Sequence, residues 1–462
     1  MSTSEKNVIE TPIETQGPNR SGSIEHVRSL DGFQQVMLRW EEIRPYNAVH
    51  AVELNGLSLC PKRLAKSAAA VFHAVGLTSV RFNHSKNKAE YTSNGNPLDI
   101  VEIDLSSASI ETISELMTDK LSDRFSTTED LPFRMALATE IHADKVSATQ
   151  YLVIGYRHAI ADAQSIVLLL KAILDHYHDG NFTNERLTCN VEGLRQIFSR
   201  DTNWRTLLPR LRKLSVELVQ GLWCSRPVAH NTNSPLKTTK VHRDCLETST
   251  LKAAARNHHA SIQDFLMAAQ AEAIAEVFEE SPSHRLVKGN RLAVTSMIDL
   301  RRYANGQLDH AIGQFLGMLA IRPTVRSTSN FSSLIESVKA QNDRSKQRRE
   351  FFWAINSMHL MARIWDVMPL SINRDLGRFL YPFVCALSNV NLGAPIFQEI
   401  ETGLITNYFR GANLGVLVPL VLSNTTVGSH MNLCTTHKDA VYSDHEVDQF
   451  IDCICRRIRQ SA

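Results

Sequence analysis

The residues best suited to chemistry in this sequence are His158 and Asp162, which lie between two strongly apolar segments. The run 149–158 is typical of a buried strand, and the segment from Ala163 to His176 has the apolar spacing of a buried helix. Proteins with alternating strands and helices often carry reactive groups on the turn that follows a buried strand. Because a neutral imidazole accepts a proton near pH 7, His158 is a candidate general base.

The spacing of these two residues also allows a structural interpretation. A His-x-x-x-Asp match is expected about once by chance in a chain of this composition, so the match alone decides little. A core histidine followed by an aspartate that caps the next helix would give the same pattern. The residues by themselves therefore leave a catalytic and a structural role open.

The composition is that of an ordinary globular protein. Of the 462 residues, 43% are apolar and 21% are charged, and 50 basic against 48 acidic side chains give a net charge of +2. This balance predicts no nucleic-acid partner. The eight cysteines are irregularly spaced and do not form a disulfide framework. The polar N-terminus and the short apolar runs predict a cytoplasmic protein without stable membrane insertion, and we expect a monomer.

The chain is predicted to begin with a tail and to divide into two halves. Residues 1–24 lack periodicity and are expected to be disordered. An N-terminal subdomain is predicted over 25–200, a bridging segment over 201–240 and a C-terminal subdomain over 241–462. Each half alternates strands with helices, which predicts an α/β fold with a mixed, helix-covered sheet in each half.

The expected elements follow from apolar spacing and from capping residues. Helices are predicted over 61–77, 110–121, 163–176, 262–279, 331–349 and 443–459. Strands are predicted over 78–82, 98–103, 133–141, 149–158, 292–297, 383–390, 414–422 and 429–435. The two strands 133–141 and 149–158 are expected to form a hairpin.

Four segments together resemble one known family. The segment RHAIADA (157–163) resembles the HHxxxDG motif of the acyltransferases related to chloramphenicol acetyltransferase, which include the condensation domains of peptide synthetases. Three further segments resemble the family in the same order. They are SIQDFLMAAQAEAIAEVF (261–278), VTSMIDLRRY (294–303) with the Gly-x-Phe at 313–315, and ALSNVNLG (386–393). The resemblance extends from about residue 30 to the C-terminus. It implies two chloramphenicol acetyltransferase-like subdomains with the active site at their junction.

The resemblance also implies roles for individual residues. His158 matches the catalytic histidine of the family. Asp162 is expected to point away from the substrate and to pair with Arg301, although a surface ion pair is the alternative. Ser388 or Asn389 is a candidate donor to the oxyanion of the intermediate or to the substrate. The alternative for these two is that they satisfy backbone groups at a strand end.

Three positions depart from the family pattern. Arg157 replaces the first histidine of the motif and is expected to alter the local charge and so the choice of substrate. Ala163 replaces the closing glycine and is expected to narrow the site. Gln314 replaces an asparagine, and no role is carried onto it.

These observations predict an acyltransferase that moves an acyl group to an amine or alcohol acceptor. The donor is acyl-CoA or an acyl group on the phosphopantetheine of a carrier protein, with no bound cofactor and no metal. We expect a stand-alone condensation-type enzyme of specialised metabolism. An acetyl-CoA-dependent O-acyltransferase and a non-catalytic homologue that serves as a binding module remain alternatives.

Two further segments have weaker signals. The segment Asp175–Asp179 contains two histidines and two aspartates, but it ends a helix, where the dipole favours cationic histidines, and no partner cluster accompanies it. The basic, amphipathic segment 205–223 could contact an acidic carrier protein or a membrane surface. We favour a packed bridging helix for it.

Overall fold

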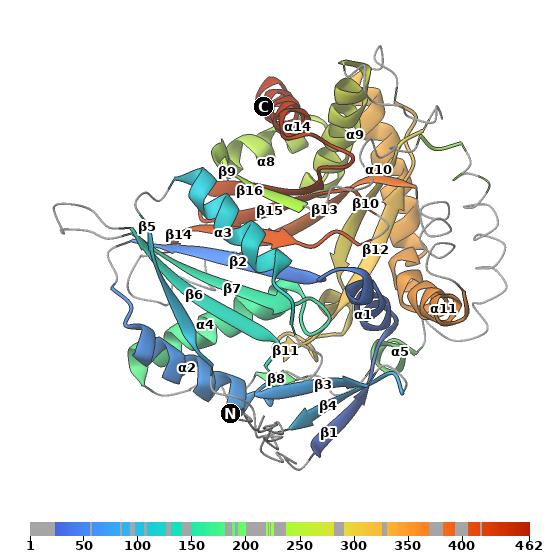
Figure 1. Cartoon of the computed structure of the whole chain (residues 1–462). Coiled ribbons are helices and arrows are strands. Elements are labelled where there is room, and N and C mark those ends of the chain that lie inside the picture. Colours follow the sequence, from blue (N-terminus) through green and yellow to red (C-terminus); the bar gives the residue numbers. More distant parts are fainter. Residues whose placement is uncertain are drawn as a thin grey trace, which may run out of the picture.

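The computed structural model places the two halves side by side around a shared centre (Figure 1). It describes residues 24–55, 58–83, 86–92, 98–105, 109–125, 131–140, 149–180, 187–189, 193–199, 219, 221, 223–225, 237–280, 291–325, 330–368, 382–392, 405–415 and 418–462. Nearly all of the predicted tail and most of the predicted bridging segment, including 205–218, lie outside the described residues.

The first half is built on a five-stranded sheet with the order β14-β2-β7-β6-β5. Only the β5–β6 pair is parallel, and β6 and β7 form the predicted hairpin. Helices α2 and α4 pack together beneath this sheet, and their apolar faces share its largest core (Figure 1). The strands are β2 (Asn47–Leu54), β5 (Ile100–Leu105), β6 (Phe133–Glu140), β7 (Gln150–Arg157) and β14 (Ile405–Ala412); the helices are α2 (Pro61–Ala74) and α4 (Ala163–Asp179).

A smaller layer flanks the first half. Its strands β1, β4 and β3 form an antiparallel sheet, and the short strands β8 and β11 pair with each other in parallel. The bounds are β1 (Ile24–Ser29), β3 (Ser79–Asn83), β4 (Lys88–Thr92), β8 (Thr188–Cys189) and β11 (Ala311–Ile312), with the short helix α5 (Leu194–Ile197) beside them.

The second half is built on a six-stranded sheet with the order β12-β10-β13-β15-β16-β9. Four helices cover its outer face (Figure 1). The strands are β9 (Lys237–Glu247), β10 (Ala293–Asp299), β12 (Leu316–Ile321), β13 (Phe383–Asn391), β15 (Leu420–Val427) and β16 (His430–Lys438). The helices are α8 (Thr248–Asn257), α9 (Ile262–Glu280), α10 (Phe331–Gln347) and α14 (Asp444–Ser461), and the 3-10 turns are η2 (Leu300–Tyr303) and η3 (Glu350–Phe352). This sheet begins at Lys237, within the segment predicted to be bridging.

Three elements join the halves. Strand β14 belongs to the second half in sequence, but it pairs with β2 in the sheet of the first half. Helix α3 (Ile110–Ser122) packs between β2 and β9, where Met117, Val241 and Phe409 share one buried cluster. Helix α1 (Gly32–Ile43) packs on α11 (Trp353–Val367) of the other half. The two halves therefore depend on each other for their cores.

Capping residues explain why the helices begin where they do. Ser261 accepts a hydrogen bond from the Asp264 N–H at the start of α9, and the Asp264 carboxylate accepts one from the Ser261 N–H, as the sequence predicts. Ser443 and Glu446 form the same reciprocal arrangement at α14. Helix α4 ends at Gly180, whose φ of 70° is the left-handed conformation that favours glycine.

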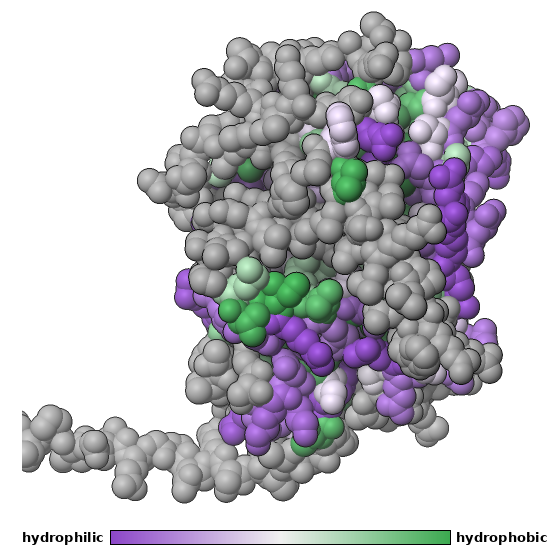
Figure 2. Space-filling view, turned by 90° about the vertical axis from the view of Figure 1, so that its right-hand side faces the viewer, coloured by the Kyte–Doolittle hydropathy of each residue, from purple (hydrophilic) through white to green (hydrophobic). Residues whose placement is uncertain are grey.

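Helix α11 carries the exposed apolar side chains of Leu360 and Val367, and Met368, which follows its last residue, is exposed as well. Figure 2 turns the right-hand side of Figure 1 toward the viewer and shows a hydrophobic patch bordered by hydrophilic residues on that face. Within the described part of the chain, no helix combines the length and apolar character needed to cross a membrane.

The strand exchange predicts that the first half does not fold alone. A fragment of residues 1–235 lacks β14, so the apolar strand β2 becomes an unpaired sheet edge, which favours aggregation. We expect this fragment to be insoluble or to lack a cooperative thermal transition. Co-expression with residues 236–462 should restore both solubility and the transition. A sharp thermal transition in the isolated fragment would contradict this dependence.

Candidate active site

The turn after β7 presents His158 at the centre of the molecule. The His158 N–H donates to the carbonyl of Tyr46 at 3.0 Å, which fixes the end of β7 against the chain entering β2. Four residues later Asp162 caps helix α4, because its Oδ1 accepts the Ser165 N–H at 2.9 Å. The backbone from strand end to helix start is thus held at both ends.

Hydrogen bonds also orient the imidazole. Its Nδ1 lies 3.2 Å from the carbonyl oxygen of Ala161, which can only accept, and 3.4 Å from the side-chain nitrogen of Gln314. The shorter contact favours the tautomer with the proton on Nδ1 and the free electron pair on Nε2. The Gln314 side-chain N–H₂ donates to the carbonyls of His158 and Ala161 and holds the turn from the other side. No hydrogen-bond partner of Nε2 is found in the described part of the chain. This is the tautomer that a general base requires.

Aromatic neighbours shield the ring. Tyr46 stacks on His158 with ring centres 5.7 Å apart, and Tyr156 lies edge-on at 6.0 Å. Burial lowers the pKa of His158 below its ordinary value of 6.5, although the Ala161 carbonyl acts in the opposite direction. The imidazole is therefore neutral at pH 7 and ready to accept a proton.

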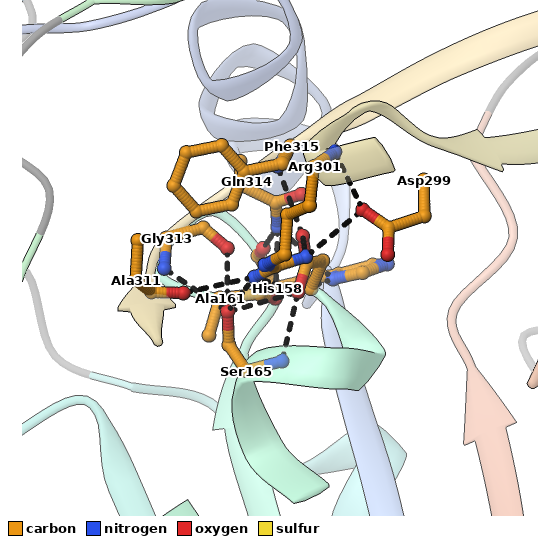
Figure 3. A network of polar contacts seen from close by, with 10 residues as sticks. His158, Ala161, Ser165, Asp299, Arg301, Ala311, Gly313, Gln314 and Phe315 are labelled. Atoms are coloured by element: carbon orange, nitrogen blue, oxygen red, sulfur yellow. Dashed lines mark hydrogen bonds and ion pairs between the residues drawn. The ribbon is translucent and has the colours of Figure 1, made fainter. Parts of the chain in front are cut away.

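Asp162 and Arg301 form a buried, two-pronged ion pair. Figure 3 shows Arg301 among its other polar partners Asp299, Ser165 and Ala311. The Arg301 Nη1 and Nη2 atoms lie 2.8 and 2.9 Å from the two carboxylate oxygens of Asp162. The exposed fractions of the two residues are 1% for Asp162 and 4% for Arg301. Although burial acts in the opposite direction, the Asp162 carboxylate raises the pKa of Arg301.

The same pair connects the turn 158–162 to the second half. The Phe315 N–H donates to Asp162 Oδ2 at 2.9 Å, and the Asp162 N–H donates to the carbonyl of Gly313. Ser165 Oγ accepts hydrogen bonds from both Arg301 and Gly313. Asp162 itself does not line the central cavity. Its contacts give it a positioning role for the turn that presents His158.

A cavity of about 120 Å³ opens beside His158. Both halves contribute to its wall, which is mostly apolar. The first half supplies Phe33, Met37, Trp40, Tyr46, Ala48, His50, Tyr156, His158 and Ala163. The second half supplies, among others, Met297, Leu316, Met318, Met358, Phe383, Ser388, Arg410, Gly415 and Ser423. A cavity with apolar walls and a few polar groups is typical of a small-molecule site.

The two candidates on β13 lie on opposite faces of the strand, because successive side chains of a strand alternate. Ser388 lines the cavity, and its Oγ accepts a hydrogen bond from Arg410 Nη1 at 3.0 Å. Asn389 is exposed outside the cavity lining, and its Oδ1 accepts from Asn424 at 2.9 Å. Of the two, only Ser388 can reach a molecule in the cavity.

The three departures from the family pattern have different surroundings. Arg157 points away from the cavity and forms a buried ion pair with Glu41 at 2.7 Å, so its charge is neutralised locally. Ala163 does line the cavity, at the first position of α4. Gln314 contacts the catalytic turn directly, a role that the sequence analysis did not assign.

Sequence reasoning missed a second group of polar residues in the cavity wall. His50 Nδ1 lies 2.6 Å from the hydroxyl of Tyr408, and His50 Nε2 lies 3.3 Å from that of Tyr156. Burial and the nearby Arg410 charge lower the pKa of His50 well below 6.5. In the sequence, His50 stands out as a histidine within the apolar segment 47–54. Its partners Tyr156 and Tyr408 come from distant segments, so the sequence alone does not show this group.

The segment Asp175–Asp179 forms the end of α4. Lys171 pairs with Asp175 at 2.7 Å, and His176 Nδ1 contacts the hydroxyl of Ser67 at 3.1 Å. Within the described ranges, no group of three or more histidine, cysteine, aspartate or glutamate residues is arranged to hold a metal ion.

Comparison with known families decides the classification. The model of the Condensation domain family matches residues 40–352, which is more than half of the chain. The chain belongs to the condensation domain family. Enzymes of this family transfer acyl groups and form amide bonds. A comparison with curated protein sequences gives no significant match.

Solved condensation domains share the fold of this one over nearly their full lengths. The first condensation domain of the calcium-dependent antibiotic synthetase, with substrate analogue 2a, has a TM-score of 0.65 and 14% identity, with 95% of this chain and 98% of that chain covered. The condensation domain of the monacolin K polyketide synthase MokA has a TM-score of 0.61 and 13% identity, with coverages of 95% and 98%. This condensation domain therefore has the two chloramphenicol acetyltransferase-like subdomains that the sequence analysis predicted.

A starter condensation domain from a peptide synthetase is also similar. A mutant of the rhizomide synthetase RzmA domain, in complex with C8-CoA and Leu-SNAC, has a TM-score of 0.62 and 15% identity, and 94% of each chain is covered. At these identities the likeness establishes the fold and leaves the substrates open.

The buried ion pair predicts strong thermodynamic coupling between Asp162 and Arg301. Arg301→Ala leaves the buried Asp162 without its arginine, and Asp162→Ala leaves Arg301 with Asp299, at 3.2 Å, as its remaining carboxylate partner among the described residues. Breaking a buried pair costs about 3–5 kcal/mol, so both variants should lower the denaturant midpoint markedly. The double variant should be far less destabilised than the sum of the two. Asp162→Asn should lose stability together with activity.

The half-exposed pair of Arg456 and Glu276 provides the matched control. The same double-mutant cycle at this pair should give a coupling of about 0–1 kcal/mol. Additive effects at Asp162 and Arg301 would show that the pair does not hold the turn. An Asp162→Asn protein of normal stability without activity would assign Asp162 a direct catalytic role.

Proposed function

We propose that this condensation domain transfers an acyl group from a thioester to an amine or alcohol, with His158 as the general base. The observation that carries the proposal is the position of His158, which lines a cavity between the two halves while its Nδ1 contacts the carbonyl of Ala161. The donor is an acyl-CoA or an acyl group on the phosphopantetheine of a carrier protein. No bound cofactor takes part.

The proposed reaction follows from the residue types in the cavity. Nε2 of His158 takes the proton of the acceptor N–H or O–H as the nucleophile attacks the thioester carbonyl. The tetrahedral intermediate then breaks its C–S bond, and the same proton passes from His158 to the departing thiolate. The new bond is an amide or an ester, and the co-product is a free thiol.

Ser388 is the proposed donor to the oxyanion of the intermediate. Its Oγ already accepts the hydrogen bond of Arg410, so its own O–H proton is available to a molecule in the cavity. The positive charge of Arg410 makes the Ser388 hydroxyl a stronger donor. Asn389, on the opposite face of β13, has no part in the proposed reaction.

The first test measures products and the effect of replacing His158. The purified chain is incubated with an amine and an alcohol acceptor and with acyl-CoA or acylated carrier-protein donors in parallel, and products are detected by mass spectrometry. We expect His158→Ala to lower turnover by roughly 10²–10⁴-fold, which is the usual contribution of a general base. His430→Ala, at an exposed position on β16, is the matched control and should leave turnover unchanged.

The outcomes separate the competing functions. Turnover with carrier-bound donors supports a condensation-type enzyme, whereas turnover with free acetyl-CoA and an alcohol supports an O-acyltransferase. Binding of thioesters without any product would indicate a binding module. Near-normal turnover in folded His158→Ala protein would exclude His158 as the base.

The lowered pKa of His158 predicts the pH dependence of the reaction. A general base works in its neutral form, so kcat/KM should be constant at neutral pH and should fall as the pH decreases through the pKa of His158. Because burial lowers that pKa, the midpoint of the fall should lie below pH 6.5. The profile is measured with an alcohol acceptor, which does not titrate in this range. A midpoint at or above pH 6.5 would contradict a pKa of His158 that is lowered by burial.

A further inference from the structure

The cavity contains a buried positive charge without a negative partner. Five arginines are buried among the described residues, and four of them form ion pairs with carboxylates. These pairs are Arg28–Asp31, Arg39–Asp366, Arg157–Glu41 and Arg301–Asp162. The fifth is Arg410 on β14, only 2% exposed, and no carboxylate of the described residues lies within ion-pair distance of it.

All hydrogen-bond partners of Arg410 are neutral. Its Nε donates to Thr425 Oγ1, its Nη1 to Ser388 Oγ, and its Nη2 to the carbonyls of Ser388 and Asn424, over distances of 2.7–3.0 Å. A guanidinium has five N–H donors, so one N–H of Nη1 has no acceptor among the described residues. These contacts hold the guanidinium group of Arg410 in one orientation, but none of them supplies a negative charge.

Neighbouring residues cannot supply the missing charge. His50 lies opposite Arg410 in the register of β2 and β14, and its pKa is lowered, so it is neutral at pH 7. Tyr408 and Tyr156, the phenols near this charge, have raised pKa values because they are buried, and they keep their protons. A buried arginine in such surroundings favours an anionic ligand, and a carboxylate matches the geometry of its fork.

The strand register locates this charge relative to the catalytic histidine. Asn47 of β2 pairs with Arg157, which immediately precedes His158, whereas Arg410 pairs with His50. The charge therefore lies three residues along the sheet, roughly 10 Å from the end that carries His158. The cavity wall that both residues share is mostly apolar, and His50 and Tyr156 are polar members of it next to them.

We propose that Arg410 binds a carboxylate of the substrate, so that this cavity selects a molecule in which an apolar body carries a carboxylate at some distance from the reacting atom. Met297, Met318 and Phe383 line the space available to the apolar body. The carboxylate can belong to the acyl group or to the acceptor. The binding site rests on the geometry of the cavity, and its role in turnover rests on the proposed acyl transfer.

A binding experiment tests the site without any reaction. Isothermal titration compares octanoate with octanamide, which has the same chain and no charge. We expect wild-type protein to bind octanoate at least about tenfold more tightly, as a charge-assisted hydrogen bond implies. Arg410→Gln should abolish this preference, and Arg410→Lys should retain part of it.

Arg157→Gln is the matched control, because Arg157 is buried equally well but outside the cavity lining. This variant should keep the preference for octanoate. Equal binding of octanoate and octanamide by the wild-type protein would overturn the proposal without the need for any variant. A preference that survives in Arg410→Gln would overturn it as well.

A turnover experiment identifies which substrate carries the carboxylate. The first pair compares two donors, the adipoyl and hexanoyl thioesters of N-acetylcysteamine, each with hexylamine as the acceptor. The second pair compares two acceptors, 6-aminohexanoate and hexylamine, each with the hexanoyl donor. If the natural donor carries the carboxylate, the adipoyl thioester should have a higher kcat/KM than the hexanoyl thioester. If the natural acceptor carries it, 6-aminohexanoate should have a higher kcat/KM than hexylamine. Arg410→Gln should remove the difference in either case. If no donor gives product while the octanoate preference remains, acyl transfer is wrong and the carboxylate site stands. Turnover with no advantage in either pair would overturn the selectivity.

Discussion

The ion pair between Asp162 and Arg301 is the interaction on which the site depends. It joins a turn of the first half to a 3-10 turn of the second half, and both residues are excluded from water. A buried pair of this kind needs further hydrogen bonds to offset its loss of water. Ser165, Ala311 and Phe315 supply such bonds, so the pair organises the turn that carries His158 and the β11–β12 segment at once.

This arrangement holds His158 rigidly, as the proposed role of a general base requires. His158 is held by backbone contacts to Tyr46 and Ala161 and by the amide of Gln314. None of these groups need titrate or move for the imidazole to take up a proton. The apolar wall keeps the imidazole neutral, while the ion pair that fixes the turn remains outside the cavity. The residue that fixes the turn and the proposed base are therefore two different residues of the same turn.

The buried arginines Arg157 and Arg410 have different surroundings. Arg157, which replaces a histidine of the family motif, is neutralised by Glu41 and faces away from the cavity. Arg410 faces the cavity with only neutral partners. A difference in substrate choice is thus better explained by Arg410 than by the substitution in the motif. Glycine also shapes this wall, because a Cβ at Gly415 would lie 2.3 Å from the ring of Trp40.

The sequence by itself determined the family, the alternation of strands and helices, and the turn that carries His158 and Asp162. Those features depend on apolar spacing, capping residues and motif order, all of which are local in the chain. The elements β2, β14 and α11 were not predicted. Their burial depends on partners in the other half, since Tyr408 and His50 meet across 358 positions of sequence. Only the tertiary structure decided that β14 crosses into the sheet of the first half and carries Arg410 to the cavity of His158, because strand pairing over such a separation has no local signal.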